Sequence, residues 1–362
     1  MIRGAGFVLT PEERGRLIER SRRNAERIFP YIGGEEVNSD PAQRFGRYVI
    51  NFGSLPLEEA EKWPDLIAIV RERVKPERDG RDHNAIALRE KKLWWLYRSD
   101  VPETRAAISG LDRCMVNSQV SKHLVFAFQP VDRIFGHTLN VYPIDRHAPF
   151  AVMQSRVHEA WARLLSSEFG SSSIGAVLRY TPTDCLRTFP FPHPDPRTVI
   201  PSLEAIGERL YEARARFMVD TDQGLTKTYN ALKDPNNDDP RVAELRALHE
   251  EMDRAVVAAY GWDLPVPPYC PKDDEERAAV QAFEDQVIDK LFALNAERAE
   301  EEKKAGAVVG AKQRGGKKKA ATGADADADA GQVAMFDPAG EAAPTPPARG
   351  GAAARGRKRG TT

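Results

Sequence analysis

A run of four alternating prolines at residues 189–196, Phe-Pro-Phe-Pro-His-Pro-Asp-Pro, constrains this chain more than any other feature. Proline fixes φ and has no backbone N–H to donate, so the run predicts a stiff, extended connector instead of helix or strand. A chain of 362 residues is long enough for two domains and a tail. We therefore predict one domain over residues 1–195 and a second over 196–302.

Residues 1–195 combine helical and strand patterns. Thr10-Pro11-Glu12-Glu13 has the form of a capping box, and it predicts a helix whose apolar stripe extends to Ile28. Residues 33–41 are rich in turn formers. The remaining pattern predicts, in chain order, a strand at 47–52, a helix at 57–74 that is interrupted at Trp63-Pro64 and stopped by Lys75-Pro76, a hairpin from 114–120 and 124–128, a third strand at 134–142, and an amphipathic helix at 149–166.

Beyond the connector the pattern is helical. Apolar residues recur at helical spacing over 203–217, over 242–256 after Asp239-Pro240, and over 280–294, with Gly261 as a stop signal. From residue 303 the chain is rich in Lys, Gly and Ala, then Ala-Asp, then Pro, Ala and Arg, which predicts a disordered tail over 303–362. The predicted fold class is α+β: a mixed α/β domain, an α-helical C-terminal domain and this tail.

The net charge of −1 conceals an asymmetry along the chain. Residues 1–199 carry 29 basic and 25 acidic side chains, residues 200–302 carry 12 and 24, and residues 303–362 carry 12 and 5. A polyanion is therefore attracted to the first segment and the tail and repelled by the middle. This distribution is compatible with nucleic-acid binding, although an acidic helical segment can also be a solvated surface.

No pattern of a catalytic site stands out. Gly4-Ala5-Gly6 lacks the preceding strand of a cofactor loop, Val266-Pro267-Pro268-Tyr269 lacks the side-chain acceptor of an amino-methyltransferase motif, and Arg81-Asp82-His83-Asn84 lacks further metal ligands nearby. We predict no metal site, and we interpret Cys114, Cys185 and Cys270 as reduced thiols. No stretch approaches the roughly 20 apolar residues of a membrane span, so we expect a cytoplasmic protein with no membrane partner.

Seven stretches, in the same order over roughly 300 residues, carry a resemblance to a known family. The chain from Gly6 to Glu302 resembles the C-terminal part of MmeI-like restriction-modification proteins. The stretches are 28–39 (IFPYIGGEEVNS), 48–60 (from YVINFG to LEEA), 71–78 (RERVKPER), 120–123 (VSKH), 178–192 (from LRYTPTD to FPFP), 224–230 (GLTKTYN) and 249–262 (from HEEMDRAV to YGW).

The resemblance implies a DNA target recognition domain followed by a helical region. Such enzymes fuse these parts to an endonuclease and to an adenine-N6 methyltransferase that uses S-adenosylmethionine. The catalytic motifs and the S-adenosylmethionine loop are not found in this sequence, so we expect no cofactor in this chain. We expect it to bind double-stranded DNA and to act with a separately encoded methyltransferase chain. The alternative is a truncated, non-functional remnant of such an enzyme.

A recognition domain must present side chains to base edges in the major groove, where Arg or Lys suits guanine and Asn or Gln suits adenine. On an ideal strand Met115, Asn117 and Gln119 share one face, opposite Val116, Ser118 and Val120. That alternation predicts an exposed reading face, and its alternative is an exposed sheet edge with no role. The candidates for base contacts are Asn117, Gln119, Ser121, Lys122, His123, Arg133, His137 and Asn140.

Other cations are better placed to contact phosphates, which position a duplex without specifying its sequence. The candidates are Arg44, Arg47, Arg179 and Lys227. For Arg179, a structural hydrogen bond within the Arg-Tyr-Thr-Pro turn is an equal alternative. The basic tail adds either salt-sensitive affinity for DNA or only solubility.

Overall fold

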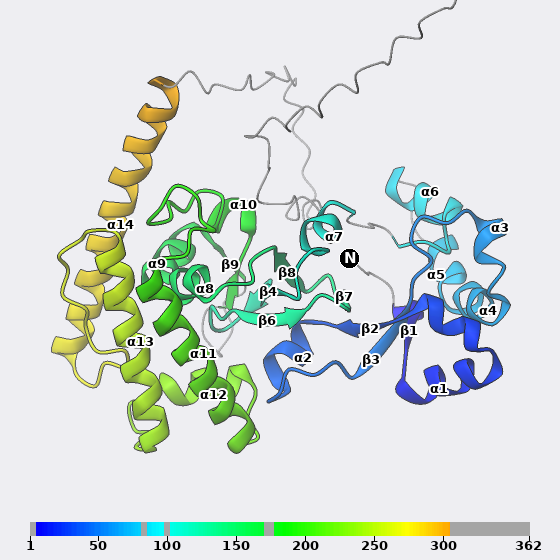
Figure 1. The fold of residues 1–362 in the computed structure, drawn as a ribbon, viewed down its shortest axis with the longest axis horizontal. Coiled ribbons are helices and arrows are strands. Elements are labelled where there is room, and N and C mark those ends of the chain that lie inside the picture. The colour runs from blue at the N-terminus through cyan, green and yellow to red at the C-terminus, as the bar shows by residue number, and fades with distance from the viewer. Residues whose placement is uncertain (1–4, 81–84, 98–101, 170–176, 305–362) are drawn as a thin grey trace, which may run out of the picture.

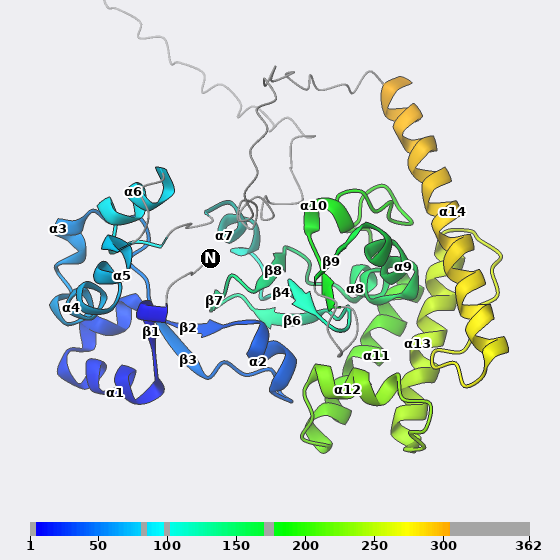
Figure 2. The ribbon, with the colours of Figure 1, turned by 180° about the vertical axis from the view of Figure 1, so that it is seen from behind.

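Two hydrophobic cores organise the computed structural model, which describes residues 5–80, 85–97, 102–169 and 177–304. The smaller core joins apolar residues between Phe7 and Tyr97. The larger core runs from Ile32 to Leu291 and contains buried residues from both sides of the proline-rich connector. Figures 1 and 2 show the N-terminal helices at one end of the molecule, the last helices at the other, and the sheets between them. The expected disordered tail lies outside the described residues, apart from the end of the last helix, and so does the segment 81–84.

The smaller core is built on a four-stranded sheet of order β1-β3-β2-β7. Strand β2 pairs antiparallel with β3 and parallel with β7, which comes from much later in the chain. The capping box at the start of α1 is confirmed, because the Thr10 hydroxyl accepts from Glu13 N and the Glu13 carboxylate accepts from Thr10 N. The elements are β1 (Val8–Leu9), α1 (Pro11–Arg20), β2 (Ile28–Ile32), α2 (Gly34–Ser39), β3 (Arg47–Ile50), α3 (Leu57–Ala60), α4 (Pro64–Arg73), α5 (Lys75–Asp79), α6 (Ala85–Lys92) and β7 (Ile134–Phe135), with 3-10 turns at Ala5–Phe7 and Arg22–Arg27.

The larger core contains two three-stranded sheets, of order β6-β4-β8 and β5-β10-β9. Strand β4 pairs antiparallel with β6 and β8. The expected antiparallel pair is present, but it joins residues 113–116 to 127–130, and Val120 pairs with β10 in the other sheet. The elements are α7 (Pro102–Ile108), β4 (Arg113–Ser118), β5 (Val120–Ser121), β6 (Ala127–Pro130), β8 (Leu139–Tyr142), α8 (His147–Gln154), α9 (Arg156–Leu165), β9 (Ser167–Phe169), β10 (Val177–Arg179) and α10 (Pro182–Cys185).

Four helices follow the connector: α11 (Pro201–Asp220), α12 (Leu225–Leu232), α13 (Pro240–Ala259) and α14 (Asp274–Lys304). Asp239 caps α13 by accepting from Arg241 N, and Gly261 takes a positive φ of 71° after that helix. Helix α11 lies against α8 so closely that a Cβ on Gly207 would be 2.4 Å from the carbonyl oxygen of His147. The predicted boundary at residue 195 therefore separates mixed from helical structure but does not separate two cores.

Several expectations at element ends are wrong. The first helix ends at Arg20, and Ile28 opens strand β2. The turn-rich segment 33–41 contains helix α2, whose N-terminus is capped by the Glu36 carboxylate accepting from Gly33 N. The expected strand at 134–142 is two strands in different sheets, and the expected helix at 149–166 breaks at Ser155.

The overall class is as predicted. The described chain mixes helices with antiparallel and mixed sheets, followed by a helical C-terminal region, so the α+β prediction is confirmed. Within the described residues, no helix is long and apolar enough to cross a membrane, and no group of His, Cys, Asp or Glu is placed to hold a metal ion. All three cysteines are free and buried. Burial raises the pKa of Cys114 to about 12 and that of Cys185 to about 11, which keeps both thiols protonated and unreactive.

Candidate nucleic-acid interface

Six of the predicted contact residues are exposed or partly exposed and lie on chain segments that contact one another. We call this set the basic polar surface: Gln119, Ser121, Lys122, His137, Arg179 and Lys227. Gln119 comes between β4 and β5, where its N–H donates to the carbonyl of Thr138 (2.9 Å) and its carbonyl accepts from Tyr180 N (2.8 Å). Val120, on the adjacent strand, pairs with Arg179 of β10. Gln119 is thus held between the turn that carries His137 and the end of β10.

The lysines of this surface meet at helix α12. The Lys122 ammonium donates to the Asn230 side-chain oxygen over 2.8 Å, and His123 Nε2 donates to the same oxygen over 2.9 Å. Lys227 lies three residues before Asn230, which puts both side chains on neighbouring positions of one helix face. Lys122 and Lys227 are both exposed. Helix α12 thus carries Lys227 and the acceptor that holds Lys122.

Helix α2 holds this support in place. The Asn38 amide donates to the Ser118 hydroxyl, and Gly34 N donates to the Thr138 hydroxyl, each over 2.8 Å. A Cβ on Gly224, at the start of α12, would lie 2.5 Å from the carbonyl oxygen of Asn38, so only glycine allows this approach. Strand β4, the 137–138 turn and α12 are thus fixed relative to one another, as a site that reads a rigid partner requires.

The predicted exposed face of strand β4 is wrong. Residues Cys114 to Ser118 are buried on both sides of the strand, and Asn117 and Asn140 are each only 1% exposed. The Asn117 oxygen accepts from the Asn140 amide (3.1 Å) and from the Tyr142 hydroxyl (2.8 Å). The physical reason is that β4 is the central strand of its sheet and lies within the larger core. In this conformation Asn117 and Asn140 stabilise the core and do not present amides to a ligand.

His123 is also buried, at 5% exposure. Burial lowers its pKa to about 4, so the ring is neutral at pH 7, and the Asn230 oxygen fixes its proton on Nε2. The Ser121 hydroxyl donates to the His123 carbonyl over 2.8 Å. In this conformation His123 does not face solvent, and its ring shares the Asn230 oxygen with Lys122.

Three predicted arginines lie outside this set of contacts. Arg47 pairs with Glu36 and covers the Tyr31 ring, at 5.2 Å from the ring centroid. Arg44 pairs with Asp40 over 3.1 Å. Arg133, with 9% of its side chain exposed, donates to Gln129 and Asp132 over 3.0 Å each. Arg44 and Arg133 line one pocket, described below.

Sequence reasoning missed Asn230, Thr138 and Asn38, which hold the surface together. Asn230 belongs to a stretch that carries the family resemblance, 224–230, but nothing local marks it as the partner of Lys122, 108 residues away. Thr138 follows His137 in a short turn between two strands. These three are polar residues in unremarkable positions, and only the fold brings them together.

A family model described as "MmeI, target recognition domain" matches residues 1–193, which is more than half of the chain. The chain belongs to this MmeI family. The matched residues of this target recognition domain end inside the proline-rich connector and include the whole basic polar surface except Lys227. No curated protein matches the chain.

The fold has a solved counterpart. The chain is similar to the structure of the type IIL restriction-modification enzyme MmeI in complex with DNA, with a TM-score of 0.52 and 16% sequence identity over 78% of this chain. The likeness extends beyond the matched family region, so it includes part of the helical segment. This chain corresponds to 34% of that enzyme, or about a third of its length.

Asn117 and Gln119 make a matched pair for testing this assignment. Asn117→Ala is expected to lower the free energy of unfolding by about 2–4 kcal/mol, because the Asn140 amide and the Tyr142 hydroxyl lose their buried acceptor. Gln119→Ala is expected to change it by less than about 0.5 kcal/mol, since that side chain is partly exposed. Urea denaturation followed by circular dichroism measures both. Equal effects would contradict the placement of Asn117 in the core.

Proposed function

We propose that this chain reads the DNA target of a type IIL restriction-modification system. The family match over residues 1–193 carries the proposal. The likeness to an enzyme solved with DNA supports it, as does the charge distribution, which is basic before residue 200 and acidic in the following helices. The basic polar surface lies in the part of the chain that a polyanion would favour.

The roles on this surface follow from the chemistry of each side chain. Gln119, Ser121, Lys122 and His137 are the proposed base-edge residues, since an amide suits adenine, an ammonium suits guanine and a hydroxyl suits either. Arg179 and Lys227 are the proposed phosphate contacts. The Asn230 oxygen holds Lys122 by a neutral acceptor, so its charge is oriented without being neutralised.

Methyl transfer is proposed to come from a separately encoded catalytic chain that binds S-adenosylmethionine. The division between two chains has its own test. The chain, co-expressed with a candidate methyltransferase from a neighbouring gene, should co-purify with it and direct methylation to one sequence. Methylation at the same sites by that methyltransferase without this chain would contradict the division.

Selection from a randomised duplex pool tests target reading directly. At about 150 mM salt, which screens much of the non-specific attraction, we expect the purified chain to enrich a motif of a few base pairs. Retention that disappears as salt rises, with no enriched motif, would contradict the proposal. It would favour the alternative that the chain is a non-functional remnant of such an enzyme.

Two substitutions separate the proposed roles. Lys227→Ala should weaken binding about equally for all sequences and reduce the slope of log K against log salt by about 1, as expected for a lost phosphate contact. Gln119→Ala should cost about 1–3 kcal/mol for the selected motif and relax the preference at one position. Fluorescence anisotropy with selected and scrambled duplexes measures both effects.

Arg209→Ala is the charge-matched control, because Arg209 is exposed on α11 and pairs with Glu251 in the acidic helical region. It should leave both the affinity and the salt slope unchanged. A loss of affinity equal to that of Lys227→Ala would mean that general charge, and not the basic polar surface, binds the DNA.

A further inference from the structure

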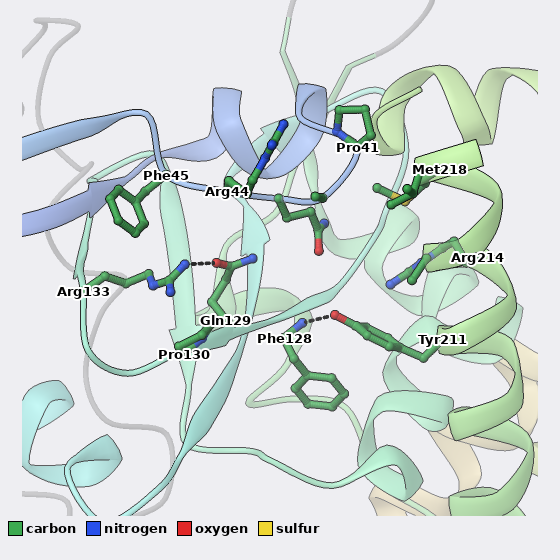
Figure 3. A pocket seen from close by; sticks show the side chains of 14 residues that line it. Pro41, Arg44, Phe45, Phe128, Gln129, Pro130, Arg133, Tyr211, Arg214 and Met218 are labelled. Atoms are coloured by element: carbon green, nitrogen blue, oxygen red, sulfur yellow. Dashed lines mark hydrogen bonds between the residues drawn. The ribbon is translucent and has the colours of Figure 1, made fainter. Parts of the chain in front are cut away.

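A pocket that no step of the proposed target reading uses lies between the 41–45 loop, strand β6 and helix α11. Its volume is about 470 Å³. Figure 3 shows Arg44 and Arg133 from one side, Arg214 from the other, with Gln129 next to Arg133 and Tyr211 on the same helix as Arg214. The Asp40 carboxylate shapes the loop by accepting from Ala42 N (2.9 Å) and Arg44 N (3.0 Å). Three arginines and no carboxylate line this space.

Arg214 is the most unusual of these residues. It is 2% exposed, and its guanidinium donates to the Phe126 carbonyl (2.8 Å), the Tyr229 hydroxyl (3.1 Å) and the Gln154 oxygen (3.3 Å). All three acceptors are neutral. Among the described residues no carboxylate forms an ion pair with it, whereas Arg44 and Arg133 each have an aspartate partner. A buried charge without a counterion is costly, and an anion in the pocket would offset that cost.

Two further donors face the same space. Gln129 is 2% exposed, and its oxygen accepts from Arg133 over 3.0 Å. Its amide nitrogen has no partner among the described residues and points into the pocket (Figure 3). The Tyr211 hydroxyl accepts from Phe128 N over 3.0 Å, which leaves its proton available to a ligand. Donors without matching acceptors on the protein indicate a ligand that accepts several hydrogen bonds.

Arginines cover one face of the Phe45 ring and one face of the Tyr211 ring. The guanidinium of Arg133 lies 5.4 Å from the centroid of Phe45, and that of Arg214 lies 5.0 Å from the centroid of Tyr211. These rings orient arginines and do not form an open slot for a planar base. The pocket thus favours recognition of a compact anion with several oxygens over recognition of a nucleobase.

We propose that this pocket binds the phosphate group of a small phosphate monoester, with Arg214 on its buried side and Arg44 at its exposed side. The depth of Arg214 favours a small molecule over a duplex, whose backbone is bulky. The site is independent of the basic polar surface and would make this chain responsive to a phosphorylated metabolite.

Isothermal titration of the full chain with inorganic phosphate and with a nucleoside 5′-monophosphate tests the proposal. We expect both probes to bind at one site and to compete. Ala215→Glu places a carboxylate at an exposed pocket residue of α11 without removing any described hydrogen bond, and it should weaken binding by about tenfold or more. Arg44→Gln should weaken it several-fold. Arg216→Gln, at an exposed neighbour outside the pocket, should leave it unchanged.

Duplex DNA distinguishes the two sources of phosphate. If the small probes bind and Ala215→Glu leaves duplex affinity unchanged, the proposal stands. If neither probe binds, or if Ala215→Glu weakens duplex binding and not probe binding, it is overturned. Both results are independent of the randomised pool selection, so failure here leaves the proposed target reading intact.

Discussion

Replacing Asp253 by alanine is expected to lower the free energy of unfolding by about 3–5 kcal/mol. Asp253 is buried in α13, with its side chain 1% exposed, and it pairs with Arg156 at the start of α9 over 2.6 Å. Its second oxygen accepts from Arg156 N over 2.9 Å. Without the carboxylate, the Arg156 guanidinium stays buried with only the carbonyls of Pro267 and Pro268 as acceptors.

Glu251 provides a matched control on the same helix. It pairs with Arg209 over the same 2.6 Å, but the two side chains are 45% and 57% exposed. Exposed pairs contribute about 0–1 kcal/mol, so Glu251→Ala should have little effect. Urea denaturation at pH 7 measures both variants. A loss of less than about 1 kcal/mol in Asp253→Ala would contradict the view that this pair joins α9, α13 and the 266–269 segment.

A double variant separates the loss of the ion pair from the cost of leaving the Arg156 charge buried without a partner. Arg156→Met with Asp253→Leu removes both charges and keeps similar volume, and such replacements are often neutral or stabilising. We expect the double variant to be more stable than Asp253→Ala. A double variant as unstable as the single one would mean that packing, and not the uncompensated guanidinium, sets the cost.

The sequence predicts what depends on neighbours in the chain. The capping box at Thr10 and the proline-initiated start of α13 follow from residues within one helical turn, and the structure has both. Alternation within 113–142 predicts strands and their pairing, because hairpin partners are close in sequence. The interruption at Trp63-Pro64 is local as well. These elements needed no knowledge of the rest of the fold.

Burial of β4 could not be predicted in this way. Alternation of Met115, Asn117 and Gln119 indicates a strand. Whether its polar face is exposed to solvent depends on β8, β10 and helices from distant parts of the sequence that pack against it. Asn117 is satisfied by Asn140 and Tyr142, which are 23 and 25 residues away. Buried amides that satisfy one another have the same sequence pattern as exposed ones. Only the structure shows which of these amides are buried.

The continuity of the larger core was also hidden. The prolines of the connector predict irregular backbone correctly, yet Phe189 and Phe191 between them are buried. Tyr260, beyond α13, donates to the Pro190 carbonyl over 2.8 Å. The connector is not extended throughout, because residues 192–197 form bends and a turn closed by Thr198 N donating to the Asp195 carbonyl. It packs on both neighbours instead of separating them, because proline restricts the backbone and leaves the phenylalanine side chains free to pack.

Acidification from pH 7 to pH 5 is expected to destabilise the fold strongly, because four histidines are buried and burial lowers the pKa of three of them far below the usual value. Burial lowers the pKa of His123 and of His158 to about 4, and that of His249 to well below its usual value. His158 Nδ1 donates to the Met153 carbonyl (2.8 Å), so Nε2 accepts from the Tyr180 hydroxyl (3.1 Å). A proton on Nε2 would break that arrangement.

The sign of the change in stability with pH follows from the number of protons that the folded and unfolded states bind. In the unfolded chain histidine titrates near pH 6.5, so between about pH 6.5 and pH 4 the unfolded state binds more protons than the folded state, and stability falls as the pH falls. Each histidine contributes at most about 1.4 kcal/mol per pH unit, and the three together about 6 kcal/mol between pH 6.5 and pH 5. Above pH 6.5 this contribution is fully present.

The charges around each ring do not reverse this expectation. Around His123, Lys233 and Lys122 lower the pKa while Glu159 raises it, and the Asn230 oxygen favours the proton without overcoming burial. Around His249, Arg214, Arg156 and Lys233 oppose protonation, and only Glu159 favours it. Cations outnumber carboxylates at both sites. At His158 the nearby Glu159 carboxylate favours the proton, and burial still lowers the pKa to about 4.

Urea denaturation at pH 7, 6 and 5 measures this dependence, and one substitution assigns it. His123→Gln keeps an N–H that can donate to Asn230 but removes the titrating ring, so it should reduce the pH dependence by about a third. His193→Gln, at an exposed histidine of the connector, should not change it. Constant stability between pH 7 and pH 5 would show that these rings are reachable by protons and solvent in the folded state. The hydrogen bonds from Lys122 and neutral His123 to Asn230 would then hold Lys122 less rigidly than their distances indicate.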